Sequence, residues 1–116
     1  MITVEREVNI SSKRLDLIHS IASVVANDLN ITEMTVNVCS SREMRSSYDA
    51  DGLCWGDNSV DIVNKRNKED LFMVIAHEMR HSFQHLNKMN LNGKYMMEKD
   101  ALEYEKVAFE KLYKLV

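Results

Sequence analysis

Apolar and polar residues alternate at the start of the chain and again near the end of its first third, with a helical pattern between. Alternation with a period of two is typical of strands with one buried face, which predicts strands over residues 2–8 and 34–40. Between them apolar residues recur at steps of three and four, which predicts an amphipathic helix over residues 12–29. Ser11 or Ser12 can cap its N-terminus.

The rest of the chain predicts a few short strands and then two helices. Residues 43–58 combine aromatic, acidic and glycine residues, which indicates short strands broken by turns. Alternation predicts a strand over residues 59–64, and helical spacing returns over residues 69–88 and 95–115. This order is typical of an α+β fold with a short mixed or antiparallel sheet. At 116 residues, we expect a single domain over residues 1–116.

Charge and hydropathy argue against two classes of ligand. The net charge is −3, and Lys and Arg are scattered among acidic residues, so we expect no nucleic-acid partner. The apolar runs are far shorter than a bilayer span and no basic-then-apolar leader opens the chain, so we expect no membrane partner. Two cysteines far apart, without a CxxC pair, favour a reducing compartment, and we expect the cytoplasm.

The candidate chemistry lies in the predicted helix over residues 69–88, where the chain carries an HExxH motif at residues 77–81. Residues four apart lie one turn above each other, so His77 and His81 can reach one tetrahedral metal ion. Glu78 lies about 100° around the helix from His77, where it can reach a water molecule without binding the metal. The histidines lie away from the main apolar face, so solvated surface histidines are the alternative interpretation.

The last predicted helix offers a third ligand. Glu98 and Glu105 both fall inside its apolar face, where a carboxylate is costly unless a positive group such as a metal ion compensates it. An antiparallel pair of helices would bring Glu98 toward His81. Glu98 is therefore the preferred third ligand, with Glu105 and Asp100 as alternatives. His85, one turn beyond His81, is predicted not to bind the metal.

HExxH followed by Glu98-Lys99-Asp100-Ala101 resembles the gluzincin metallopeptidases, and the compact length is similar to the minigluzincins and the ImmA/IrrE-type peptidase domains. The resemblance covers residues 50 to 110 approximately and implies a small zincin-like domain. It implies that His77, His81 and Glu98 bind zinc (Zn2+) and that Glu78 is the catalytic general base.

The same resemblance implies a substrate site and exposes one departure from the family pattern. In the family a short edge strand ahead of the zinc helix binds substrate in extended form, and residues 59–64 are the matching segment here. Leu102 stands where the family usually has Asp or Asn, which orients a ligand histidine. Asp61, Asn64 or a backbone carbonyl are the candidate substitutes.

The implied activity is hydrolysis of peptide bonds in a protein or peptide substrate, through a zinc-bound water whose proton Glu78 takes. The family also uses a donor for the oxyanion, for which Tyr95, Tyr104, His85 and Arg80 are candidates. The alternatives are a non-catalytic zinc-binding interaction or regulatory module and a metal-free helical regulator.

Overall fold

The computed structural model of the chain describes residues 1–40, 51–56, 58–89 and 92–116. In these residues, three α-helices and a four-stranded mixed sheet make up an α+β fold, as predicted. In chain order the elements are β1 (Ile2–Arg6), α1 (Ser12–Leu29), β2 (Met34–Cys39), β3 (Gly52–Cys54), β4 (Ser59–Val63), α3 (Lys68–Leu86), α4 (Gly93–Leu112) and the short 3-10 helix η1 (Tyr113–Leu115).

The predicted elements agree with these bounds to within a few residues. The helix over residues 12–29 is confirmed with the same ends, because Ser11 caps its start and Asn30 closes it in the left-handed conformation, at φ 58°. The stretch predicted to hold short strands contributes β3, and its residues 43–50 and 57 lie outside the described residues.

The strand order in the sheet is β1-β2-β4-β3. β1, β2 and β4 run parallel, while β3 pairs antiparallel with β4 and forms an edge of the described sheet. Alternate residues of the central strands turn their side chains toward the helices, so that Val36 lies opposite Val60 and Val38 opposite Ile62, all fully buried. The chain therefore crosses from β1 to the neighbouring parallel strand β2 through α1, and it passes through the edge strand β3 before it returns to β4 beside β2.

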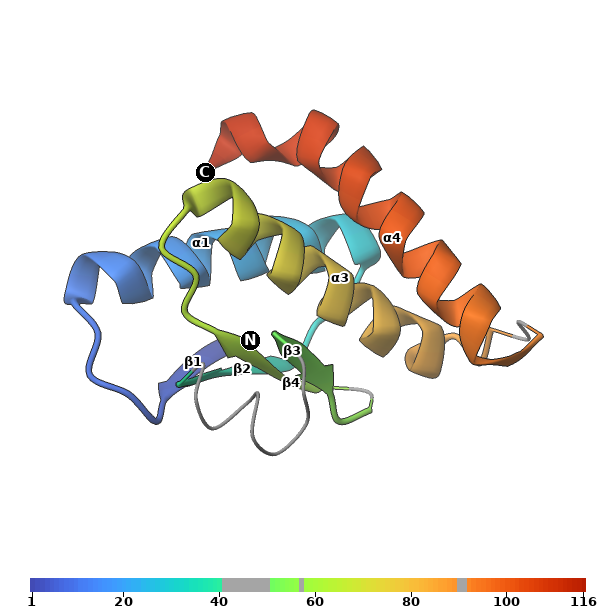
Figure 1. Ribbon diagram of the computed structural model, residues 1–116, viewed down its shortest axis with the longest axis horizontal. Helices are drawn as coiled ribbons and strands as arrows, with labels where there is room; N and C mark the ends of the chain where they lie inside the picture. The colour runs from blue at the N-terminus through green and yellow to red at the C-terminus, as the bar shows by residue number, and fades with distance from the viewer. Residues whose placement is uncertain (41–50, 57, 90–91) are drawn as a thin grey trace.

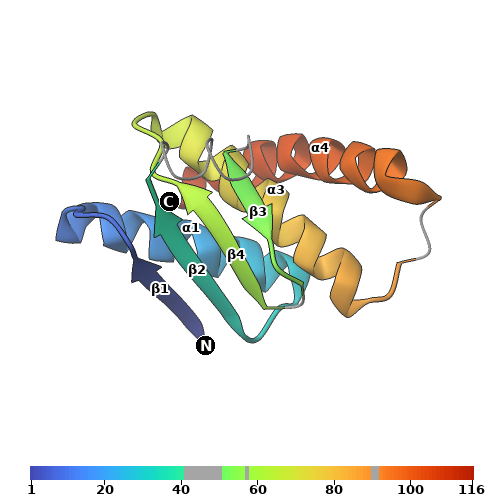
Figure 2. The same cartoon turned by 60° about the horizontal axis from the view of Figure 1, so that its bottom comes forward.

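The helices lie on one face of the sheet in two layers (Figure 1). α1 and α3 rest on the sheet, and α4 packs across α3 on the side away from the strands. Figure 2 shows β3 at the end of the sheet nearest α3. The main core lies between the sheet and the inner helices, and its largest fully buried side chains include Ile18, Ile21, Met34, Phe72, Ile75 and Met79. Within the described ranges, none of the helices is long and apolar enough to cross a bilayer.

Side chains fix the point at which α3 begins. The guanidinium of Arg14 on α1 donates to the Asn64 side chain at 3.0 Å and to the carbonyls of Lys65 and Arg66, so it ties the β4–α3 turn to α1. Asn67 then caps the helix, because its side chain accepts from the backbone N–H groups of the first turn. The register of α3 against the sheet is set by these contacts.

Candidate metal centre

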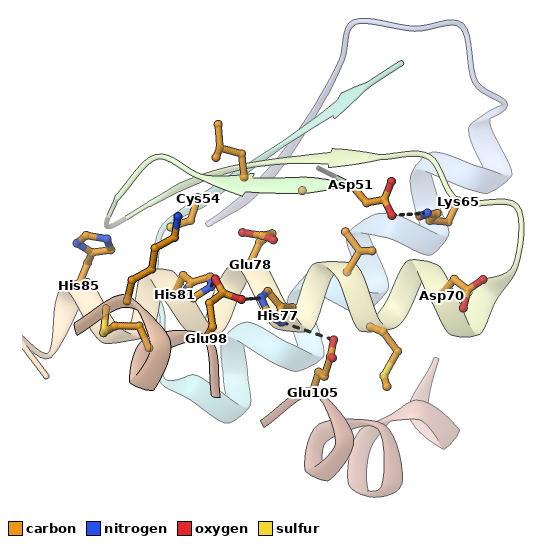
Figure 3. A pocket seen from close by; sticks show the side chains of 16 residues that line it. Asp51, Cys54, Lys65, Asp70, His77, Glu78, His81, His85, Glu98 and Glu105 are labelled. Carbon is orange, nitrogen blue, oxygen red and sulfur yellow. Dashed lines mark hydrogen bonds and ion pairs between the residues drawn. The ribbon is translucent and has the colours of Figure 1, made fainter. Parts of the chain in front are cut away.

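Two histidines of α3 and one glutamate of α4 meet between the helices. His77 and His81 are one turn apart, and their rings are 4.9 Å apart at an interplanar angle of 80°. Glu98, in the second turn of α4, lies with Oε2 3.1 Å from Nε2 of His77 and Oε1 2.9 Å from Nε2 of His81. Figure 3 shows the carboxylate of Glu98 facing both imidazoles. The prediction that these three residues come together is confirmed.

This cluster has the dimensions and the chemistry of a metal site. One ligand atom from each residue lies within 4.8 Å of the other two, so His77, His81 and Glu98 could hold a metal ion. Tetrahedral ligands about 2.0–2.1 Å from zinc are about 3.3 Å apart, close to the separations of Glu98 from the two imidazoles. Two imidazole nitrogens and one carboxylate also form a ligand set that leaves a fourth position open.

The surroundings of His81 favour a cation beside its Nε2. Gln84 donates from Nε2 to the Met97 carbonyl and to Oδ2 of Asp100, so its Oε1 is the atom that faces Nδ1 of His81, at 2.8 Å. On the other side of the ring, Nε2 faces a Glu98 oxygen. A neutral imidazole has only one N–H to donate. When Nδ1–H is bound to Gln84, two lone pairs face each other across 2.9 Å unless a proton or a metal ion lies between them.

His77 has carboxylates on both sides. Glu98 approaches Nε2, and Oε2 of Glu105 lies 3.7 Å from Nδ1. Burial, helped by the nearby His81 and opposed by Glu98, lowers the pKa of His77 below its usual value, so the neutral imidazole that a metal requires is favoured. Burial raises the pKa of Glu105, whose carboxylate lies on the far side of the ring from Glu98. Glu105 is therefore placed to orient His77 rather than to share its ligating nitrogen.

Glu98 is more exposed than its position in the helical projection suggested. Its side chain is 45% exposed, whereas that of Glu105 is 14% exposed. The early turns of α4 border a cleft, whereas Ala101 and Ala108 in its later turns are fully buried. Glu98 nevertheless directs both carboxylate oxygens at the imidazoles.

Glu78 is buried beside this cluster, with 9% of its surface exposed. Its side chain lies under β3, and a β-carbon added to Gly52 would come within 2.7 Å of its Cγ and 2.8 Å of its Oε2. Burial is the main reason that the pKa of Glu78 is raised to about 7; Glu98 and Glu105 raise it further and His81 lowers it. Glu78 therefore has a carboxyl group whose pKa lies close to neutral pH.

A cleft of about 940 Å³ contains the cluster. The exposed face of α3 forms its floor, with β3 along one side and the first turns of α4 along the other (Figure 3). The resemblance placed the substrate-binding edge strand at residues 59–64, and this assignment is wrong. β4 is bonded to β2 on one side and to β3 on the other, so its backbone groups are taken, and β3 is the strand that borders the cleft.

The structure gives Asp100, an alternative third ligand, a different set of partners. Its carboxylate accepts two hydrogen bonds from Arg80, at 2.7 and 3.2 Å, and a third from Gln84. These bonds, first those from Arg80, hold the pKa of Asp100 below its usual value despite burial. Asp100 is therefore bound to the other helix and is not one of the three grouped ligands.

Asp61 and Asn64, which were the candidates to replace the family's histidine-orienting Asp or Asn, bind other residues. Asp61 binds the Asn37 amide and the Trp55 indole N–H, and Asn64 binds Arg14. Gln84, three residues after His81, instead takes the position beside that ring. Gln84 was not among the predicted site residues, although a glutamine three residues after a candidate ligand histidine lies on the same helical face.

Of the four candidates for the oxyanion donor, His85 borders the cleft. Tyr104 donates to Asp28, at 2.8 Å, and the side chain of Arg80 is bound to Asp100. Tyr95 is 76% exposed and is not part of the cleft lining. His85 is therefore the one of the four candidates that the structure places at the cleft.

Comparison of the chain with known proteins gave no match: no family model, no curated protein and no solved structure is significantly similar to it. The fold class and the metal-binding geometry therefore rest on the residues themselves.

Proposed function

We propose that this chain is a zinc-dependent metallopeptidase of the gluzincin type, with His77, His81 and Glu98 as zinc ligands and Glu78 as general base. The observation that carries the proposal is the meeting of both imidazole Nε2 atoms at one carboxylate, beside a buried glutamate in an open cleft. The spacing of the HExxH motif and of the later glutamate supports the same class.

Zinc is the metal that this ligand set fits best. Imidazole nitrogen suits zinc better than it suits calcium or magnesium, which prefer oxygen ligands. Two histidines and one glutamate are a known ligand set of catalytic zinc, with an open position for solvent or substrate. When bound in such a site, zinc polarises a carbonyl group and lowers the pKa of water.

Glu78 supplies the proton transfers. A general base works best when its pKa is near the working pH, and burial brings Glu78 into that range. We assign to it the removal of a proton from the attacking water and the delivery of that proton to the leaving amine. Contact with Gly52 holds the carboxyl group between β3 and the ligand cluster, where the reacting peptide bond would lie.

The substrate that suits the cleft is an extended segment of a peptide or protein. β3 is a short edge strand in the described sheet, and it lies along the cleft that contains the ligand cluster. Extended peptides bind such edges by adding a strand through backbone hydrogen bonds. We therefore assign β3, and not β4, to substrate binding.

The test combines metal analysis with hydrolysis of a peptide library, before and after chelation and re-addition of zinc. Wild type is expected to bind about one zinc ion per chain and to cleave peptides only when zinc is present. Glu78→Gln is expected to keep the zinc ion and to lose about 99% of turnover or more, since general base catalysis contributes 10²–10⁴-fold. Residual turnover above about one-tenth of wild type in this variant would overturn the role of Glu78.

A non-catalytic zinc-binding module is the second candidate, and Leu102 is the observation that favours it. Leu102 is 47% exposed and apolar at the position where the family has a polar partner for a ligand histidine. Zinc binding without any chelator-sensitive peptide cleavage would select this candidate over the peptidase.

A further inference from the structure

Among the described residues, Gln84 is the largest deeply buried polar side chain that the proposed chemistry does not use. Its surface is 1% exposed, and its side chain makes three hydrogen bonds, one to His81 within α3 and two to residues of α4. A buried amide is costly unless all of its groups are bonded, so each of the three bonds contributes to a fixed orientation.

The first bond acts on a proposed zinc ligand. Oε1 of Gln84 accepts from Nδ1 of His81 at 2.8 Å, which places the proton of the neutral imidazole on Nδ1. The lone pair of Nε2 is then directed at Glu98, where the metal is proposed to bind. Without this acceptor, Nε2–H would instead donate to the Glu98 carboxylate and block the ligating atom.

The other two bonds act on the helix that carries Glu98. Nε2 of Gln84 donates at 2.9 Å to the Met97 carbonyl and at 2.9 Å to Oδ2 of Asp100. These acceptors lie directly before Glu98 and two residues after it in α4. Arg80, one turn before Gln84, holds the same Asp100 carboxylate with two further bonds. The turn that presents Glu98 is thereby attached to the turn that presents His81.

We infer that Gln84 is the positioning residue of the metal centre: it sets the tautomer of His81 and fixes the α4 turn that carries Glu98. The inference rests on the proposed metal site. It also explains how the centre is organised although Leu102 replaces the polar residue of the family pattern, because Gln84 reaches the ligand histidine from its own helix.

The test compares Gln84→Met, which removes all three bonds, with Gln84→Glu, which keeps the size and the acceptor for His81 but loses both donors. Tyr104→Phe is the control, since it removes a hydrogen bond between α4 and α1 without touching the cluster. Two quantities are measured: the tautomer of His81 in metal-free protein, by nitrogen NMR of the imidazole, and the zinc dissociation constant, by competition with a chelator.

In the wild-type protein, His81 is expected to be the Nδ1–H tautomer. Gln84→Met should shift His81 toward the Nε2–H form and weaken zinc binding about 10- to 100-fold. Gln84→Glu should keep the Nδ1–H form but weaken zinc about tenfold, because its carboxylate faces the Met97 carbonyl and Asp100. Tyr104→Phe should leave both quantities unchanged and only lower the stability of the fold.

An unchanged tautomer together with a zinc dissociation constant within about twofold of wild type in Gln84→Met would overturn the positioning role. If Gln84→Met does not fold, Gln84→Glu decides the matter, with unweakened zinc binding as the contrary result. Failure of wild type to bind zinc would overturn the proposed function and this role together. Zinc binding without peptide hydrolysis would overturn only the peptidase activity, because neither measurement depends on turnover.

Discussion

Gly52 of β3 lies directly against Glu78 of α3, so closely that a β-carbon at Gly52 would be 2.7 Å from Cγ of the glutamate. The absence of a side chain at this position lets the edge strand pass over the proposed general base. The strand proposed to bind substrate is therefore in direct contact with the carboxyl group proposed to transfer protons.

Gly52→Ala is expected to lower turnover about 100-fold while the zinc content stays at wild-type level. The new methyl group must displace either β3 or the Glu78 side chain, and a displacement of about 1 Å in a catalytic group costs this much in rate. Steady-state hydrolysis and metal analysis on the same preparation check this prediction.

Gly56→Ala is the control: a β-carbon there meets nothing within 4 Å, but φ of +121° makes the change strained, so stability should fall and turnover per folded molecule should not. Equal losses of turnover in both variants would show that the contact between Gly52 and Glu78 is not the cause of the loss.

Alanine substitutions at three acidic residues of α4 separate the zinc ligand from its neighbours. Glu98→Ala should reduce zinc from about one ion per chain to nearly none, because it removes one of three protein ligands. Glu105→Ala and Asp100→Ala should keep zinc but bind it about tenfold more weakly, since these residues act on His77 and on Gln84. Zinc content and affinity of the purified variants provide the measurement. A normal zinc content in Glu98→Ala, with loss in either of the others, would assign the third ligand elsewhere.

Removal of the metal is expected to destabilise the fold. The proposed ligands come from both α3 and α4, so an ion bound to them holds the helices together and favours the folded state. At a free zinc concentration about 100 times the dissociation constant, the gain is about 2.7 kcal/mol, which for a domain of this size raises the unfolding temperature on the order of 10 °C. Thermal unfolding with and without a chelator measures the effect. Glu98→Ala should unfold at the same temperature in both conditions, and a chelator effect of wild-type size in that variant would show that the ion binds elsewhere.

Asp28 makes the stability of the fold depend on pH. Burial alone would raise its pKa, but hydrogen bonds from Lys111, at 2.6 Å, and from Tyr104, at 2.8 Å, outweigh burial and lower the pKa below its usual value. Because the folded pKa lies below the unfolded one, this stabilisation is fully present above about pH 4 and is lost as the pH falls through the folded pKa.

Asp28→Asn should therefore destabilise the protein by about 1 kcal/mol at pH 7, and the difference from wild type should shrink in strong acid. Urea unfolding of both proteins at pH 7 and in strong acid measures this difference in the free energy of unfolding. Asp16→Asn, an exposed carboxylate on the same helix, gives the effect of removing one negative charge without these contacts. A difference between wild type and Asp28→Asn that stays constant down to the lowest pH would argue against the contribution of the ionised carboxylate.

Local periodicity determined a large part of this protein from sequence alone. The helix over residues 12–29 and the strand ending at Cys39 follow from the spacing of apolar residues, which depends on the geometry of a single element. The facing positions of His77 and His81 follow from the helical repeat in the same way. Glu98 was preferred because a carboxylate on an apolar helical face needs a positive partner; the structure places it at the two imidazoles, although 45% of its side chain is exposed and Glu105, on the same face, is the more buried of the two.

Only the tertiary structure decided which contacts join different elements. The strand order β1-β2-β4-β3 makes β3 the strand beside the cleft and encloses β4 between β2 and β3, and no local pattern distinguishes these two strands. Asp100 occupies a position that looks solvent-exposed on an isolated helix, but packing of α4 on α3 brings it to Arg80 and Gln84. Gly52 and Glu78 are far apart in the chain, and their contact depends on how the sheet lies on α3. A single helix or strand specifies which way each side chain points, whereas the partner it meets is set by the packing of several elements at once.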